Sequence, residues 1–199
     1  MLKLEKHSFI FLRHGQTDAN LNEVAQGQLD YPLNPLGRQQ MVEATHVLAP
    51  YLSALGPQTI HTSTLRRAKE SVKIIKSYFP QTKIKYHEDL SEAHWGVKTG
   101  KSPHPWRKKW LGDKYVPDRG ISFLDYRTRV VNKINHILKE AALHDPVPII
   151  LGHGGTWWAL MRVLGRPIHL AGNASVMLVS YEYGRLRIRT LTAATGKEN

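Results

Sequence analysis

Short apolar runs alternate along the chain with longer amphipathic stretches. Six of these runs have the length and the β-branched or aromatic content that are typical of strands, and turn-forming residues bound them. They cover residues 7–12, 58–61, 83–86, 147–151, 175–181 and 185–191. Because only Glu182, Tyr183 and Gly184 separate the last two, these are predicted to form a hairpin of antiparallel strands.

Four stretches between the strands repeat apolar residues at helical spacing. The first opens with Asn34 as a cap and Pro35 in the first turn, and the second begins at Arg67 and is stopped by Pro80. Ser122 to Asp125 reads as a capping box that opens a third, long helix, and a fourth covers about residues 155–164. The apolar positions are Met41, Ala44, Leu48, Leu52 and Leu55 in the first helix, Ala68, Val72, Ile75 and Phe79 in the second, and Tyr126, Val130, Ile134, Ile137, Leu138 and Ala141 in the third.

This order of elements predicts an α/β fold. Strands that alternate with helices favour a mostly parallel central sheet with right-handed crossovers, flanked by helices in a three-layer sandwich. The hairpin adds one antiparallel edge strand. A length of 199 residues and 41% hydrophobic content are sufficient for one compact domain.

A histidine follows two of the apolar runs, and a glycine follows each histidine. His14 and Gly15 come after the first run, and His153 and Gly154 come after the fourth. An open α/β sheet places reactive groups at the carboxyl ends of its strands, so the two histidines are predicted to share a site. Arg13 adds a planar cation suited to phosphate, and imidazole can act as a nucleophile. The combination indicates phosphoryl chemistry.

Residues 13–20 read Arg-His-Gly-Gln-Thr-Asp-Ala-Asn, which resembles the signature of the histidine phosphatase superfamily, the family of phosphoglycerate mutases and related phosphatases. The resemblance continues in the family's order through residues 27–40, 63–68, 90–100 and 153–155. It implies the phosphoglycerate mutase-like fold in a single histidine phosphatase domain, residues 1–199. A short insertion at about 101–119, broken by three prolines, is expected to form an irregular lid.

The resemblance also implies roles for individual residues. His14 would be the nucleophile, Glu92 the general acid and His153 the second catalytic histidine, while phosphate or substrate would be bound by Arg13, Asn20, Gln26, Arg67, Trp95 and Gly154. His94 is an alternative proton donor to Glu92. Two arginines and two imidazoles would supply the charge that a metal otherwise provides, so neither a metal nor another cofactor is expected.

The charge of the chain allows another interpretation. Lys and Arg number 28 against 16 Asp and Glu, a formal net charge of +12, and residues 106–110 interleave tryptophan with cations. That pattern occurs in single-strand binders, but it also suits a basic collar that steers anionic substrates, which we favour. Nucleic acid is therefore not the expected partner; a small phosphorylated substrate is, and a homodimer remains open.

The absence of cysteine excludes disulfides and thiolate metal sites. The N-terminus has no apolar core of a signal peptide and no run is long enough to span a bilayer, so we expect a cytoplasmic protein without membrane contact. The function expected is hydrolysis of phosphate monoesters of small metabolites through a phosphohistidine. The alternatives are a phosphoglycerate mutase and a non-catalytic basic scaffold. Ile121 stands where relatives commonly have glutamate, which argues against the mutase.

Overall fold

A computed structural model describes residues 2–54, 58–144 and 147–191. Its centre is a six-stranded sheet with the order β3-β2-β4-β1-β5-β6. The strands are β1 (Phe9–Arg13), β2 (Thr59–Thr62), β3 (Lys83–Tyr86), β4 (Ile149–Gly152), β5 (Val176–Glu182) and β6 (Arg185–Leu191). All six predicted strands are present, within one or two residues of the expected bounds.

The directions of the strands follow the prediction of a mostly parallel sheet. The pairs β1 with β4, β4 with β2, and β2 with β3 are parallel. At the other side, β5 is antiparallel to β1 and β6 is antiparallel to β5, so that β5 alone of the six runs against the others. The hairpin of β5 and β6 therefore forms one edge of the sheet, where β6 is the outermost strand.

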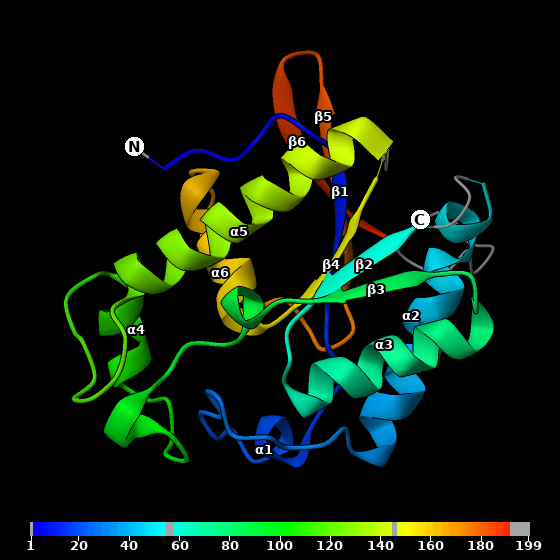
Figure 1. The fold of residues 1–199 in the computed structure, drawn as a ribbon. Coiled ribbons are helices and arrows are strands. Elements are labelled where there is room, and N and C mark those ends of the chain that lie inside the picture. The colour runs from blue at the N-terminus through cyan, green and yellow to red at the C-terminus, as the bar shows by residue number, and fades with distance from the viewer. Residues whose placement is uncertain (1, 55–57, 145–146, 192–199) are drawn as a thin grey trace, which may run out of the picture.

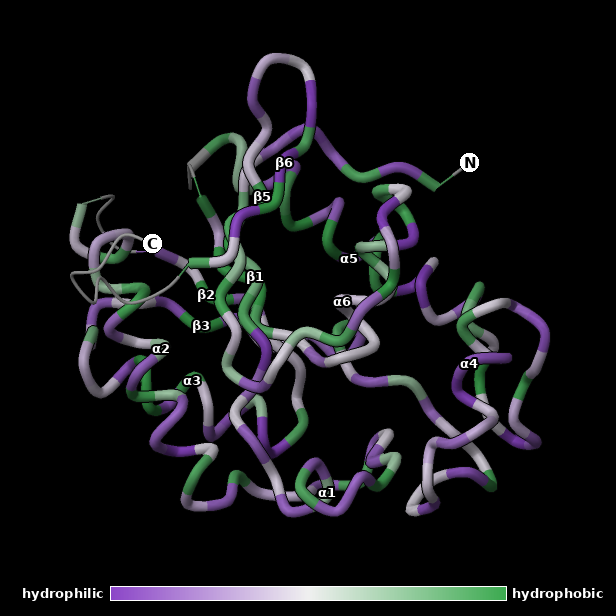
Figure 2. The backbone as a smooth tube through the Cα atoms, turned by 180° about the vertical axis from the view of Figure 1, so that it is seen from behind, coloured by the Kyte–Doolittle hydropathy of each residue, from purple (hydrophilic) through white to green (hydrophobic). Residues whose placement is uncertain are grey.

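Helices cover both faces of the sheet, which makes three layers (Figure 1). On one face lie α2 (Pro35–Ala54) and α3 (Arg66–Tyr78), which pack with Ile10, Leu12 and Ile60 of the strands. On the other lie α5 (Phe123–His144) and α6 (Gly154–Val163), which pack with Phe9 and Phe11. Figure 2 shows the same separation from behind. Alternate residues of β1 thus belong to two different cores, as the period of a strand requires.

The helices agree with the sequence patterns to within one or two residues. Both Pro35 and Ser122 act as expected: α2 begins at Pro35, and the Ser122 hydroxyl caps α5 by accepting from Asp125 N at 3.0 Å. α3 begins at Arg66 rather than Arg67, and it ends before Phe79. Leu55 and the polar tail from Thr192 lie outside the described residues.

Residues 101–119 do not form an irregular loop throughout, contrary to the prediction. They contain the short helix α4 (Trp106–Leu111), whose Trp106 and Trp110 pack edge to face against Trp95 at 5.1 and 4.4 Å between ring centroids. Pro105 stands at the N-cap of this helix and Gly112 at its C-cap, so the prolines flank the helix and do not prevent it. The aromatic cluster stabilises a helix that is too short to be stable alone.

The two ends of this segment meet at its base. Val97 N donates to Asp118 O at 3.0 Å, and Ile121 N donates to His94 O at 2.9 Å. The backbones are so close that a Cβ on Gly96, whose φ is +51°, would lie 1.9 Å from Asp118 O. Three further short helices were not predicted: α1 (Asp18–Leu21), η1 (Glu88–Leu90) and η2 (Gly96–Lys98). Within the described residues, no helix is both long and apolar enough to cross a membrane.

Candidate active site

The two predicted histidines meet because their strands are neighbours. β1 and β4 pair in parallel with Arg13 opposite Gly152, so the next residues, His14 and His153, leave the sheet side by side. His14 N donates to Gly152 O at 3.2 Å, and the two imidazole rings lie 5.2 Å apart between centroids. Register alone therefore brings together residues that are far apart in the sequence.

The hydrogen bonds of His14 define which ring nitrogen can react. Its Nδ1 lies 2.7 Å from the carbonyl oxygen of Gly15, and since a carbonyl can only accept, Nδ1 carries the hydrogen. Nε2 is then left with its lone pair. Burial, followed by the charges of Arg67 and Arg13, holds the pKa of His14 well below its ordinary value. The ring is thus neutral and nucleophilic at neutral pH.

His153 is completely buried beside His14 and is held from the next strand. Its Nε2 shares a hydrogen bond of 2.7 Å with the Ser63 hydroxyl, which follows β2. Its buried Nδ1 has no hydrogen-bond partner among the residues that the structure describes. Burial, with Arg67 and His14 as further causes, keeps the pKa of His153 well below its usual range. An unpartnered buried nitrogen is costly, and a bound ligand could satisfy it.

Two buried arginines complete the floor of the site. Arg13 donates to Ala171 O, whereas Arg67 donates to Leu29 O at 2.9 Å and to Gly27 O at 2.8 Å. Burial lowers the pKa of each to about 10, so both stay charged at neutral pH. No salt bridge joins either guanidinium to a carboxylate in the part of the chain that the structure describes. Charges that are buried without counter-ions suit an anionic ligand.

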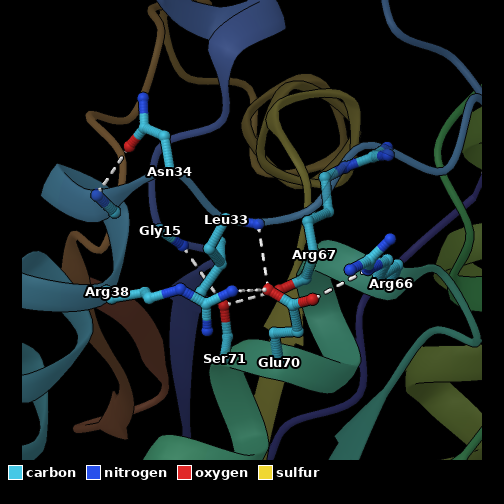
Figure 3. Close-up of polar contacts among 9 residues, drawn as sticks. Gly15, Leu33, Asn34, Arg38, Arg66, Arg67, Glu70 and Ser71 are labelled. Carbon is cyan, nitrogen blue, oxygen red and sulfur yellow. Dashed lines mark hydrogen bonds and ion pairs between the residues drawn. The ribbon is translucent and has the colours of Figure 1, made fainter.

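A network of polar contacts fixes Arg67 relative to the His14 loop (Figure 3). The Ser71 hydroxyl donates to Arg67 O at 2.8 Å and accepts from Gly15 N at 3.3 Å. Glu70, the residue before Ser71 in α3, accepts from Leu33 N at 3.1 Å and forms a salt bridge with Arg66 at 2.8 Å. Arg66 is therefore an ion-paired surface residue that supports the helix, while its neighbour Arg67 points into the site.

Glu92 reaches the same site from the loop after η1. Its Oε1 accepts from Ala93 N at 2.8 Å and its Oε2 accepts from Gly155 N, in the first turn of α6, at 3.0 Å. Gly155 leaves room for the carboxyl, because a Cβ there would lie 2.2 Å from Oε1. His94, the alternative donor, is exposed and is not among the pocket-lining residues.

Arg13, His14, Arg67 and Glu92 line one pocket of about 400 Å³. The remaining predicted residues, Asn20, Gln26, Trp95 and Gly154, are also in its wall. The Asn20 amide oxygen accepts from Thr17 N at 3.2 Å and from Asn173 Nδ2 at 3.1 Å, which ties the first loop to the segment after α6. All predicted site residues are thus in the pocket wall except His153, which is completely buried beside His14.

The sequence interpretation missed several residues of the site. Arg107 of α4 lines the pocket with its guanidinium 5.3 Å from the centroid of the Trp158 ring, and burial lowers its pKa. Ser63 had been noted only as part of a motif, without a role. The basic run at 106–110 was a signal for Arg107, but only the fold shows that this one cation of the run turns inward. Among the residues that the structure describes, no group of three His, Cys, Asp or Glu side chains is placed to hold a metal ion.

Comparison with known proteins agrees with this geometry. A model of the histidine phosphatase superfamily (branch 1) matches residues 9–194. Glucosyl-3-phosphoglycerate phosphatase of Mycolicibacterium vanbaalenii is 31% identical over 173 residues, which is 80% of this chain and 75% of that protein. A 2,3-bisphosphoglycerate-dependent phosphoglycerate mutase of Nitrobacter winogradskyi is 27% identical and covers 81% of this chain and 82% of its own length.

Solved structures give the same result. Mycobacterial glucosyl-3-phosphoglycerate phosphatase in complex with VO3 superposes with a TM-score of 0.76 at 27% identity, over 92% of this chain and 97% of that one. The predicted phosphoglycerate mutase-like sandwich is therefore confirmed. With the matched model spanning nearly the whole chain and named phosphatases among its relatives, this protein belongs to the histidine phosphatase superfamily and is an enzyme of the phosphoric monoester hydrolase class.

Proposed function

We propose that this protein hydrolyses phosphate monoesters of small metabolites through a phosphohistidine on His14. The observation that carries the proposal is the state of His14 itself. It is a neutral, buried imidazole with its Nδ1 hydrogen engaged by Gly15 O, and it shares a pocket with Arg13 and Arg67, neither of which forms a salt bridge within the described chain. A nucleophile and two guanidiniums in one pocket suit a phosphoryl group.

In the first step, Nε2 of His14 attacks phosphorus in line with the ester oxygen. The N–P bond forms as the P–O bond breaks, while Arg13 and Arg67 hold the equatorial oxygens and Nδ1 of His153 can contact one of them. Glu92 gives its proton to the departing oxygen, so that the product leaves as an alcohol. No metal ion is needed in this scheme, because the guanidiniums supply the positive charge.

In the second step, water attacks the phosphohistidine. The O–P bond forms and the N–P bond breaks, which regenerates neutral His14 and releases inorganic phosphate. Glu92, ionised by the first step, takes the proton from water and is ready for another cycle.

The outer part of the pocket bears on the substrate class. Its volume of about 400 Å³ is in the range of small-molecule sites. Trp95, Trp158 and Arg107 line this pocket together with the phosphate-binding candidates. Since one relative is a glucosyl-3-phosphoglycerate phosphatase, we propose that the substrate is a phosphorylated metabolite with a polar or anionic body. A panel that includes glucosyl-3-phosphoglycerate and 3-phosphoglycerate tests this assignment.

The mutase alternative is kept because named mutases are among the relatives. Ile121 argues against the mutase, because an isoleucine at this position offers no carboxylate. Its side chain packs beside the core of the α5 and α6 face, and its carbonyl accepts from Trp110 Nε1 at 2.8 Å. Purified protein given 3-phosphoglycerate and 2,3-bisphosphoglycerate should release inorganic phosphate. Formation of 2-phosphoglycerate without phosphate release would favour the mutase.

The central test is trapping of the phosphoenzyme. Rapid quenching during turnover of p-nitrophenyl phosphate should give an acid-labile, base-stable phosphate on His14, and His14→Ala should lose both this species and turnover while keeping its fold. His136→Ala, an exposed histidine of α5, is the matched control and should resemble the wild type. Wild-type turnover in His14→Ala would contradict the mechanism.

A further inference from the structure

Helix α5 places two polar side chains behind Glu92, outside the pocket. Tyr126 and Arg129 are three residues apart and therefore share one face of the helix. The Arg129 guanidinium lies 5.3 Å from the centroid of the Tyr126 ring. Neither residue belongs to the pocket lining, and neither takes part in the mechanism above.

Arg129 holds the backbone that leads to Glu92. Its Nη1 donates to Glu88 O at 3.1 Å and its Nη2 donates to Ser91 O at 3.0 Å. These two carbonyls stand at the start of η1 and directly before Glu92. The position of the acid along the pocket wall is thus fixed by a guanidinium of α5.

Tyr126 reaches the carboxyl itself. Its side chain is completely buried, and a Cβ added at Gly155 would meet both Glu92 Oε1 at 2.2 Å and Tyr126 Oη at 2.8 Å. The two oxygens therefore converge on the same small space above α6. Burial, and after it the nearby Glu92 carboxyl, raises the pKa of Tyr126 well above its ordinary value, so the hydroxyl keeps its hydrogen.

One end of this chain of hydrogen bonds has a fixed donor. His153 N can only donate, and it donates to Thr156 Oγ1 at 3.3 Å. The Thr156 hydroxyl lies 3.4 Å from Tyr126 Oη, and either hydroxyl can be the donor of that contact. When Thr156 donates, the tyrosine hydrogen is available to the Glu92 carboxyl beside it.

We propose that Tyr126 donates its hydroxyl hydrogen to the Glu92 carboxyl and that Tyr126 and Arg129 together are the positioning residues of the acid. Ala93 N and Gly155 N already occupy one lone pair on each carboxyl oxygen. Tyr126 would be a third donor, on the side of the carboxyl that faces α5. The carboxyl proton would then lie on the side that faces the pocket, where the leaving oxygen of the substrate would lie. This inference rests on the proposed function, in which Glu92 is the general acid.

Other charged groups also face Glu92, and they set the background of the test. They come from three other elements: Arg13 of β1, Arg67 of α3 and Arg107 of α4. All three lie on the pocket side, and Tyr126→Phe removes none of them. The substitution removes one oxygen and keeps the ring, which packs 5.9 Å from Trp110 between centroids.

The experiment compares kcat/KM of Tyr126→Phe for 2-glycerophosphate, an alkyl phosphate, and for p-nitrophenyl phosphate, whose leaving group needs little protonation. Loss of one hydrogen bond to a charged group predicts a loss of about ten- to hundredfold on the alkyl phosphate, and a much smaller one on the aryl phosphate. Tyr51→Phe on α2, at the opposite face of the sheet, is the control and should leave kcat/KM unchanged for both substrates.

A double-mutant cycle separates this role from a structural one. In a Glu92→Gln background, Tyr126→Phe should cause no further loss on the alkyl phosphate, because there is no proton left to direct. Thr156→Val, which removes the hydroxyl next to Tyr126 Oη, should give a smaller loss with the same preference for the alkyl phosphate, and this variant is the test if Tyr126→Phe does not fold. Equal losses on both substrates, additive losses in the cycle, or no loss at all would overturn the inference. A wild type that hydrolyses neither substrate would instead refute the proposed phosphatase.

Discussion

The floor and the outer wall of the pocket are built in different ways. The floor consists of His14, Arg13, Arg67 and Glu92, and every one of these side chains is held by a backbone group of another segment or of its own loop. The wall at α4 rests largely on packed aromatic side chains, with indole hydrogen bonds from Trp106 to Ser102 O and from Trp110 to Ile121 O. The Arg107 guanidinium lies on the Trp158 ring, and no ion pair joins it to a carboxylate among the described residues. The difference indicates that the floor is built for one fixed chemical group, whereas the wall can change with the substrate.

Arg67→Met tests the floor most severely. Loss of a cation that would hold the transferring phosphoryl group should lower kcat/KM by about 10³-fold, for alkyl and aryl phosphates alike. Steady-state kinetics on both substrates measure this. The control is Arg66→Met, the exposed neighbour, which should stay near the wild type; similar losses in both variants would mean that α3 and not the guanidinium is responsible.

Gly155→Ala tests the floor through its backbone. The new Cβ would lie 2.2 Å from Glu92 Oε1, so the carboxyl has to move. We expect a loss of about 10²-fold for alkyl phosphates, the lower end of what general acid catalysis contributes, and less for p-nitrophenyl phosphate. In the control Gly112→Ala the nearest atoms are 3.5 Å away. Unchanged kinetics in Gly155→Ala would show that Glu92 need not hold this position.

Arg107→Met tests the wall. If the wall only selects the body of the substrate, KM for an anionic metabolite should rise about tenfold with little change in kcat, because one charged contact is lost that ground and transition states share. For p-nitrophenyl phosphate, which has no second anion, the variant should resemble the wild type. Lys109→Met, on the same helix but outside this pocket, serves as the control. A fall in kcat on both substrates would place Arg107 in the floor.

The pH dependence tests whether the two histidines at the floor stay neutral. Because the pKa values of His14 and His153 lie well below the ordinary 6.5, kcat/KM should not fall with a midpoint near 6.5 as the pH is lowered. Stability behaves differently. The unfolded chain takes up protons on these histidines below about pH 6.5 and the folded chain does not, so the free energy of unfolding should decrease as pH falls below that value. Urea titrations between pH 8 and 5 measure it, and His14→Asn should flatten the slope.

The smallest expected effect is that of a chelator. With two guanidiniums to neutralise the phosphoryl oxygens, EDTA should leave activity unchanged. Activity lost to EDTA and restored by a divalent ion would show that the floor is incomplete without a metal.

The same comparison explains what the sequence could predict. Arg13 and His14 could be predicted from the end of a strand, because parallel register brings two separate His-Gly pairs into one site. Arg67 and Glu92 could be predicted only through the motifs that the chain shares with the histidine phosphatase superfamily. The wall residues could not be placed in this way. Whether Arg107 or Lys108 turns inward depends on how Trp106 and Trp110 pack on Trp95, which no local pattern specifies. The same packing forms α4, which the prolines of the segment do not indicate. The contact of Ser63 with His153 depends on the pairing of β2 with β4, which the sequence does not specify.

The closed base of the segment that carries α4 has a consequence for how such an enzyme can diversify. Hydrogen bonds join Val97 to Asp118 and Ile121 to His94 at this base. The distance between the two ends of the segment is therefore set by these bonds and not by the residues between them. A replacement of different length or composition would leave the ends of β1 and β4 where they are. This segment can thus be exchanged for another one, and a new substrate preference could arise without a change in the residues that bind and transfer the phosphoryl group.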